Sequence, residues 1–195
     1  MSVFAAAREV AWRKMLALDR RTLLAVRRLE SEALTGLMQK LTRLGDASTW
    51  IVVGLALGTV GGPRFFGLLG LGSGFAVILS QLLKRLCRRE RPHLAITGLA
   101  ALAEIPDAFS FPSGHTAAAF AAATALAGEG TGLAVLVTAL ALGIALSRIY
   151  LGAHYPLDVL AGAGLGISTG LAARLLVASF PLLRFVGSAT LASWG

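Results

Sequence analysis

The sequence predicts an all-α protein, an integral membrane helical bundle of about five transmembrane helices that follows an N-terminal amphipathic arm. Hydrophobic residues make up 56% of the 195 residues, and the mean hydropathy of +0.75 exceeds that of an ordinary soluble domain. Charged residues are confined to a few short stretches. A membrane crossing needs about 20 mainly apolar residues, and five such segments fit after residue 45 when each takes a few flanking residues. A single domain over residues 1–195 is expected.

The arm comprises residues 1–45. Apolar residues with helical spacing fall on one face of its second half, with charged and polar residues between them: Leu34, Leu37, Met38 and Leu41. Charges of both signs make a lipid-exposed crossing expensive in this region, and they do not form the pattern of a secretory signal peptide. We therefore expect one or two helices that lie in the membrane interface.

The transmembrane core comprises residues 46–195. Its spans are predicted, in order, from uncharged stretches at 47–63, 66–83, 109–128, 130–147 and 159–173, the last of which continues beyond Arg174. Gly162, Gly166 and Gly170 recur every four residues in the last span, which predicts a face for close helix packing. This face can pack within one chain or between chains, so the oligomeric state is left open.

Two polar loops are predicted on the same side of the membrane. The loop at 84–112 joins the second and third spans, and the loop at 148–155 joins the fourth and fifth. Two crossings separate the loops, so both emerge on one face. Cations of the first loop can therefore meet the histidines at 115 and 154.

The chemistry of these loops points to phosphate. Lys84, Arg91 and Arg148 supply donors suited to phosphate oxygens, although a basic run at a membrane edge is also typical of contacts with lipid headgroups. The net charge of +8 does not indicate nucleic acid, because the basic residues border apolar spans. The single cysteine, Cys87, offers neither an intrachain disulfide nor a metal cluster.

The stretch Pro112–His115 reads as a helix start. Free backbone N–H groups and the positive end of the helix dipole make such a start an anion site, and Gly114 lets an oxygen approach closely. His115 beside that anion is a candidate proton donor to a leaving oxygen. The alternative is that Ser113 only caps the helix and His115 packs at the interface.

His154 stands where the last span begins, and Asp158 lies four residues further along. A carboxylate at this spacing can accept from one imidazole nitrogen and leave the other as a nucleophile. The alternative is a helix-capping aspartate beside a coincidental histidine.

Three motifs in this order resemble the type 2 phosphatidic acid phosphatase family of membrane lipid phosphatases, which shares its active site with vanadium haloperoxidases. They are K-x6-R-P at 84–92, P-S-G-H at 112–115 and S-R-x5-H-x3-D at 147–158. The resemblance implies that His154 attacks phosphorus and forms a phosphohistidine, that Asp158 orients it, and that His115 protonates the leaving group. It also implies five phosphate-binding residues: Lys84, Arg91, Ser113, Gly114 and Arg148.

The resemblance further implies a metal-independent, cofactor-free enzyme with its site on the extracytoplasmic face of the membrane. The usage of Ala, Gly, Leu and Arg and the size of the chain indicate a bacterial protein, and so an inner membrane. The expected substrate is a lipid phosphate or diphosphate among membrane lipids: undecaprenyl diphosphate, phosphatidylglycerophosphate or phosphatidic acid. Arg85, Arg88 and Arg89 fall outside the motif positions and are expected to be surface or headgroup contacts. Two alternatives remain: a zinc site built from His115, His154 and Asp158, and a membrane protein that binds or transports lipid phosphates without turnover.

Overall fold

The computed structural model describes residues 3–105 and 107–180, and within these residues it contains helices and no strand. The expected all-α fold is confirmed. The helices are, in order, α1 (Val3–Arg27), α2 (Glu32–Arg43), α3 (Ala47–Gly61), α4 (Pro63–Cys87), α5 (Pro92–Ala95), α6 (Gly114–Leu126), α7 (Thr131–Tyr150) and α8 (Pro156–Ser179).

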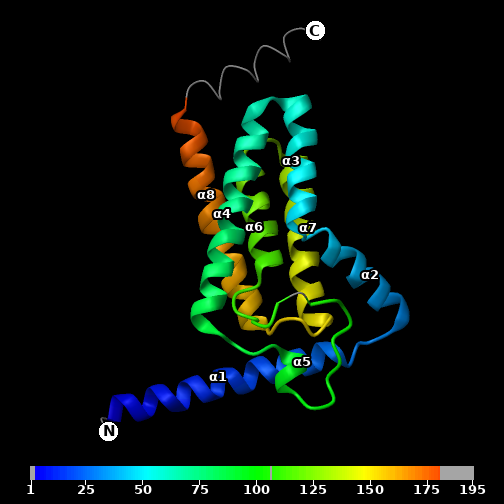
Figure 1. The fold of residues 1–195 in the computed structure, drawn as a ribbon, viewed down its shortest axis with the longest axis vertical. Coiled ribbons are helices and arrows are strands. Elements are labelled where there is room, and N and C mark those ends of the chain that lie inside the picture. Colours follow the sequence, from blue (N-terminus) through cyan, green and yellow to red (C-terminus); the bar gives the residue numbers. More distant parts are fainter. Residues whose placement is uncertain (1–2, 106, 181–195) are drawn as a thin grey trace.

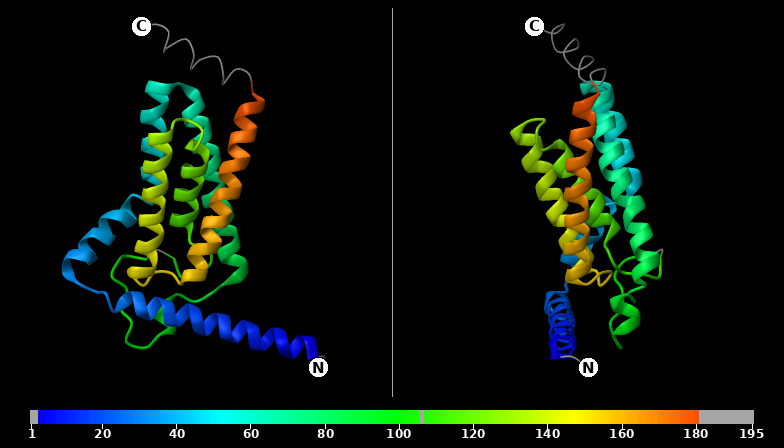
Figure 2. Two further views of the ribbon diagram at one scale, coloured as in Figure 1. Left: turned by 180° about the vertical axis from the view of Figure 1, so that it is seen from behind. Right: turned by 90° about the vertical axis from the view of Figure 1, so that its left-hand side faces the viewer.

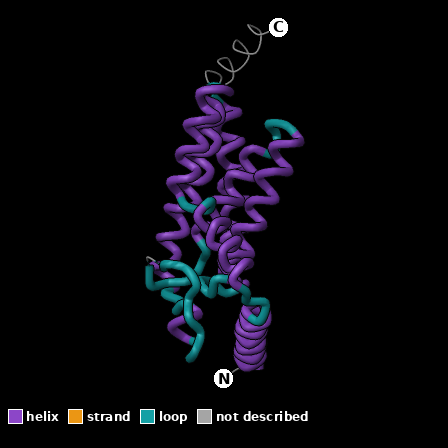
Figure 3. Tube along the Cα trace, turned by 90° about the vertical axis from the view of Figure 1, so that its right-hand side faces the viewer, coloured by secondary structure: helices purple, strands orange, loops and turns teal. Residues whose placement is uncertain are grey.

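Five of these helices form a bundle with α6 at its centre. α3, α4, α6, α7 and α8 run side by side, and α6 contacts α4, α7 and α8 (Figure 1). α1 lies across the lower end of the bundle, roughly perpendicular to it, where the long loops also gather (Figures 2 and 3). This is the orientation expected of an interfacial arm beneath a membrane bundle.

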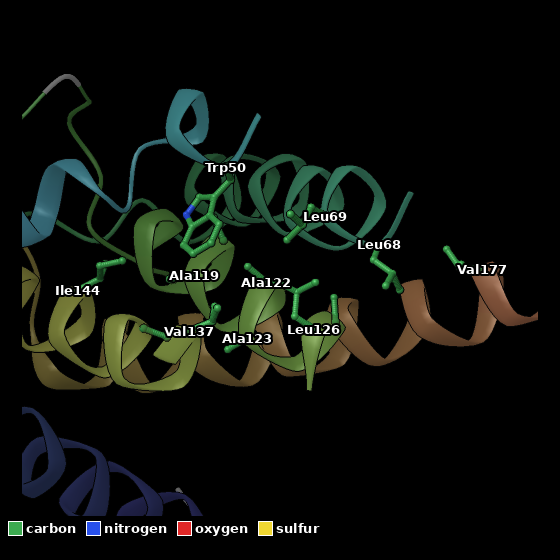
Figure 4. Close-up of a cluster of buried hydrophobic side chains, with 13 residues drawn as sticks. Trp50, Leu68, Leu69, Ala119, Ala122, Ala123, Leu126, Val137, Ile144 and Val177 are labelled. Atoms are coloured by element: carbon green, nitrogen blue, oxygen red, sulfur yellow. The ribbon is translucent and has the colours of Figure 1, made fainter. Parts of the chain in front are cut away.

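The core is built around small side chains of α6. Alanines of this helix, including Ala119 and Ala122, are fully buried and allow close approach of the surrounding helices. Larger side chains from α3, α4 and α7 fill the remaining space, as Figure 4 shows for Trp50, Leu68 and Ile144. Because α6 is enclosed, it buries its surface against protein instead of lipid.

Three helices are long and apolar enough to cross a membrane: α4, α7 and α8. The other two bundle helices are shorter, with 15 residues in α3 and 13 in α6. At about 1.5 Å per residue, α6 spans only about 20 Å. The protein therefore has membrane-spanning helices, whereas the count of five crossings stays a prediction.

The glycine face of α8 packs against α6, as the four-residue spacing predicts. A Cβ atom added at Gly166 would lie 2.3 Å from the carbonyl oxygen of Ala117, and one at Gly170 would lie 2.6 Å from that of Ala121. Backbone atoms cannot move aside as the end of a side chain can, so only glycine allows this approach. The close packing is thus within the chain.

We expect Gly166→Ala to destabilise the bundle by about 1–3 kcal/mol, the usual cost of an overpacked core. The measurement is the thermal midpoint of unfolding in detergent. Gly164→Ala is the matched control, because a Cβ at Gly164 on the same helix meets nothing within 4 Å. Equal midpoints for the two variants would contradict the packing argument.

Candidate active site

The two polar loops meet at the lower end of the bundle, as the count of crossings predicts. The backbone N–H of Ser110 donates to the carbonyl of Arg89 over 2.8 Å, and that of Ser113 donates to the carbonyl of Asp158 over 2.9 Å. The second bond joins the start of α6 to the start of α8. The three motifs are therefore held together by backbone as well as by side chains.

His154 is enclosed at the centre of this region, with an exposed fraction of 1%. Its Nδ1 lies 2.7 Å from the carbonyl oxygen of Ser110, and its Nε2 lies 3.3 Å from a terminal nitrogen of Arg91. A carbonyl only accepts, so Nδ1 carries the proton and Nε2 keeps its lone pair. The lone pair consequently faces the cationic side of the site.

Burial lowers the pKa of His154 well below its ordinary value, and the positive charges of Arg148, Arg91 and Lys84 lower it further. All three phosphate-binding cations expected from the motifs therefore act on this ring. The imidazole is neutral at neutral pH, which is the form a nucleophile needs.

Asp158 is placed differently from the expectation. Its Oδ2 lies 3.7 Å from Nδ1 of His154, beyond hydrogen-bond distance, because the carbonyl of Ser110 already takes that proton. The same Oδ2 accepts the backbone N–H of Tyr155 over 2.9 Å. Asp158 thus caps the start of α8 and lies next to the histidine, which combines both alternatives drawn from the sequence.

The expectation that Arg89 is a surface or headgroup contact is wrong. Its guanidinium donates to Oδ1 of Asp158 over 2.6 Å and to Oδ2 of Asp19, in α1, over 2.5 Å. It also stacks over the ring of Tyr155, 4.1 Å from the centroid. Two buried carboxylates draw this arginine inward, and Asp19 gave no sequence signal because it lies far away in the arm.

Asp19 links the arm to the site by a second bond. Its Oδ1 accepts the backbone N–H of Leu157 over 2.8 Å. This N–H belongs to the first turn of α8, where donors have no partner within the helix. Asp19 of α1 therefore supplies a hydrogen-bond acceptor to the first turn of α8, which begins two residues after His154.

Asp107 forms ion pairs with both cations of the first motif, Lys84 and Arg91. Its carboxylate accepts from Nζ of Lys84 over 2.6 Å and from the guanidinium of Arg91, and its carbonyl oxygen accepts from Nε of Arg91 over 2.8 Å. Burial raises the pKa of Asp107, but the hydrogen bonds and charges of Lys84 and Arg91 outweigh it, so the pKa is lowered. The sequence showed this residue only as a loop position.

His115 and Arg148 face the N-terminal arm. Nε2 of His115 lies 2.8 Å from Oδ1 of Asp46, which precedes α3. A terminal nitrogen of Arg148 donates to the hydroxyl of Thr42 in α2. Nε of Arg148 is buried and has no hydrogen-bond partner among the described residues, so a donor of this motif residue is left for a ligand.

Ser113 caps α6, as the simpler alternative from the sequence predicted. Its buried hydroxyl oxygen accepts from the backbone N–H of Thr116 over 3.5 Å, which is the capping bond, and from the hydroxyl of Thr116 over 2.9 Å. Gly114 is the first residue of the helix. Its N–H belongs to the first turn, whose donors point out of the helix end.

The zinc alternative gains no support from the geometry. Within the described part of the chain, no three side chains of His, Cys, Asp or Glu gather closely enough to hold a metal ion. Instead, Arg91 lies against His154 and Arg89 against Asp158, which places cations where that metal would lie.

Comparison with known proteins agrees with this arrangement. The sequence model of the PAP2 superfamily matches residues 65–180, more than half of the chain. The chain belongs to the PAP2 superfamily. The resemblance inferred from the three motifs is confirmed, and the matched segment contains all eight motif residues expected at the site.

Several relatives of this PAP2 protein are named as phosphatases, and another is named as the bacitracin transport permease protein BcrC of Bacillus licheniformis. The chain is 42% identical over 125 residues to decaprenylphosphoryl-5-phosphoribose phosphatase of Mycobacterium tuberculosis, covering 62% of this chain and 67% of the relative. It is 32% identical over 135 residues to undecaprenyl-diphosphatase of Sulfolobus acidocaldarius, covering 68% and 66%. The crystal structure of Aquifex aeolicus LpxE is similar, with a TM-score of 0.72, 28% identity, and coverage of 78% and 92%. The expected class, a membrane hydrolase acting on lipid phosphates, is confirmed.

Proposed function

We propose that this PAP2 protein removes the terminal phosphate from a lipid phosphate or diphosphate without a metal, through a phosphohistidine at His154. The observation that carries the proposal is the position of the His154 ring. Its Nδ1 is held by the Ser110 carbonyl, and its Nε2 faces Arg91. A neutral imidazole with a fixed tautomer, whose lone pair faces the phosphate-binding cations, is suited to nucleophilic attack.

In the first half of the reaction, Nε2 of His154 attacks phosphorus as the bond to the leaving oxygen breaks. His115 gives its proton to that oxygen. In the second half, water attacks the phosphohistidine and returns a proton to His115. Phosphate then leaves, and His154 is neutral again.

The phosphate oxygens are assigned to five groups: the side chains of Lys84, Arg91, Arg148 and Ser113 and the N–H of Gly114. Charge that develops on these oxygens in the transition state is stabilised by donors that are fixed and buried in the protein. The unpartnered Nε of buried Arg148 supports this assignment. Asp158 acts through its neighbours, by holding the start of α8 next to His154.

Candidate substrates are undecaprenyl diphosphate, phosphatidylglycerophosphate and phosphatidic acid. The Mycobacterium tuberculosis relative adds a decaprenylphosphoryl sugar phosphate to these candidates. We place the enzyme in a bacterial inner membrane with its site on the extracytoplasmic face. The amphipathic arm then lies on the same face, because α1 crosses the end of the bundle that holds the site (Figure 1).

The direct test is phosphate release from these lipids by detergent-solubilised protein in EDTA. Release that survives chelation is the expected result. If none of the lipids loses phosphate, the catalytic proposal fails and a protein that only binds or transports lipid phosphates takes its place. If release stops on chelation, the metal-independent mechanism fails.

The pH dependence of kcat/KM is expected to show the protonation of the His154 imidazole. Its pKa lies below the ordinary value of about 6.5, so the reactive neutral form persists as the pH falls to that value. Activity is lost through protonation of His154 as the pH falls further, through the lowered pKa, and it is lost on the basic side as His115 gives up the proton that the leaving oxygen needs. The measurement is kcat/KM against pH in a detergent whose charge is constant. An acid limb with its midpoint above about 6.5 would contradict this.

Asp107→Asn is expected to tighten inhibition by inorganic phosphate about three- to tenfold. The Asp107 carboxylate binds Lys84 and Arg91, so an incoming phosphate must displace it. An uncharged amide of the same shape competes less for these charge-assisted bonds. The inhibition constant is measured alongside Glu90→Gln, which removes an exposed negative charge nearby. Weaker inhibition in Asp107→Asn would mean that the carboxylate positions the cations for phosphate.

A further inference from the structure

Asp46 immediately precedes α3, at the position from which an aspartate usually caps a helix. Its backbone is extended, as a cap residue requires, but its side chain forms no capping hydrogen bond. Oδ1 of Asp46 lies instead 2.8 Å from Nε2 of His115, the proposed proton donor, which is 69 residues further along the chain. Capping of α3 therefore does not explain where this carboxylate points, whereas its bond to His115 does.

The turn between α2 and α3 packs against the same imidazole ring. Gly45 is buried in this turn, and a Cβ atom added to it would lie 3.1 Å from both Cβ and Cδ2 of His115. Gly45 and Asp46 thus cover the edge of the ring that carries Cδ2 and Nε2. The opposite edge, which carries Nδ1, is left to face a ligand, and His115 lines a cavity together with the proposed phosphate-binding residue Arg148.

This placement gives the two ring nitrogens of His115 different tasks. A carboxylate only accepts, so Nε2 carries a proton in the neutral ring as well as in the charged ring. The second proton of the imidazolium is then on Nδ1. As the bond from phosphorus to the leaving oxygen breaks, the proton on Nδ1 passes to that oxygen, and the ring stays bound to Asp46 through Nε2–H. Water that attacks the phosphohistidine returns a proton to Nδ1.

The surrounding cations make it harder for His115 to hold this second proton. Burial lowers the pKa of the ring, and the positive charges of Arg148 on α7 and Lys84 on α4 lower it further. Asp46 acts in the opposite direction, because its charge and its hydrogen bond raise the pKa of His115. Two further charged residues line the same cavity and are exposed: Arg43 and Glu104.

We propose that Asp46 is a positioning residue for proton transfer, which holds Nε2 of His115, turns Nδ1 toward the leaving oxygen and stabilises the protonated ring beside the phosphate-binding cations. The inference rests on the proposed function and adds to it a residue that lies outside the three motifs and outside the segment matched by the superfamily. The turn between α2 and α3 then takes part in the chemistry of the site.

The test is Asp46→Asn, which keeps an acceptor for Nε2 and removes the charge. Asparagine suits the start of a helix as well as aspartate does, so the fold should persist. We expect the basic limb of the rate against pH to move to lower pH by about 0.5–1 pH unit. A nearby opposite charge changes a pKa by about 1–3 units, and the smaller value is expected because 49% of the Asp46 side chain is exposed.

The measurement is the single-turnover rate at which the lipid loses its phosphate to saturating protein in EDTA, as a function of pH. It reports the first half of the reaction, in which His115 is the acid. The substrate is whichever of the three candidate lipids the wild type cleaves fastest. On the basic side of both midpoints the Asp46→Asn rate should be about three- to tenfold lower than the wild-type rate, as the shift of the limb requires. On the acidic side of the limb the two rates should agree within about twofold.

Glu104→Gln is the matched control, because it removes another carboxylate from the lining of the same cavity. It should leave the basic limb where it is. Asp46→Glu keeps the charge and should return the limb toward its wild-type position.

Three results would overturn the role of Asp46 and leave the proposed phosphatase intact. They are an unchanged basic limb in Asp46→Asn, a rate that falls by the same factor at every pH, and an equal shift in Glu104→Gln. The second would mean that Asp46 only supports the structure, and the third would mean that the total charge of the cavity is what matters. Failure of the wild type to release phosphate from any of the three lipids would overturn the proposed function itself.

Discussion

His154→Ala is expected to lower the rate of phosphate release by at least about 10³-fold, because it removes the nucleophile of a two-step reaction. The fold should persist, because the one ion pair of His154 among the described residues is its 3.7 Å contact with Asp158, and Arg89 also binds that carboxylate. Phosphate release is measured in single turnover with labelled substrate. The wild type should also yield a labelled protein that is stable in base and labile in acid, as a phosphohistidine is.

The control for this experiment is His93→Ala. His93 lies in the short helix α5 beside the first motif and has no assigned role in the reaction. It should retain activity within about threefold. If His154→Ala keeps more than about a tenth of wild-type activity, or if labelled protein forms without His154, the histidine is not the nucleophile.

The second large effect concerns stability. Arg89→Ala leaves the carboxylates of Asp19 and Asp158 without their shared cation, and both of these side chains are 0% exposed. Removing one partner of a buried ion pair costs about 3–5 kcal/mol. Because 21% of the Arg89 side chain is exposed, we expect the lower end, about 3 kcal/mol. We also expect kcat to fall about tenfold, because Asp158 borders His154.

Unfolding in detergent and kcat are measured together, with Arg85→Ala as the matched control. Arg85 is an exposed arginine of the same basic run, and its loss should change neither quantity measurably. Arg89→Lys should recover part of the stability, because one ammonium cannot match the planar fork that reaches both carboxylates. If Arg89→Ala behaves like Arg85→Ala, the network between α1 and α8 does not stabilise the protein.

Much of the fold follows from the distribution of charge along the chain. Uncharged stretches predict the bundle helices, and the count of crossings brings the loop at 84–112 to the loop at 148–155. The glycines of α8 predict the face that contacts α6. The lengths of the uncharged stretches predict the helix lengths less closely. The stretch 109–128, for example, contains loop residues before Gly114 as well as α6.

The site is predicted unevenly. The motif cations and both histidines come from the sequence, because each sits in a short pattern with fixed spacing. Their acidic partners do not. Asp19 lies 70 residues from Arg89, Asp46 lies 69 residues from His115, and Asp107 lies 16 and 23 residues from Arg91 and Lys84. No local spacing connects these pairs. The sequence does not predict the buried contacts of Arg89 for the same reason, because one of its two carboxylate partners, Asp19, belongs to the arm and approaches only in the folded chain.

The hydrogen bond from Leu157 to Asp19 concerns how much of the chain the site depends on. The segment matched by the PAP2 superfamily, 65–180, contains every motif residue and excludes Asp19, Thr42 and Asp46. A fragment cut at residue 65 would keep the reacting groups and lose the carboxylate that completes the first turn of α8. It would also lose the side chains that meet His115 and Arg148. We therefore expect a fragment that begins at residue 65 to be less active than the chain with its arm, because the arm supplies hydrogen bonds to the residues next to the site.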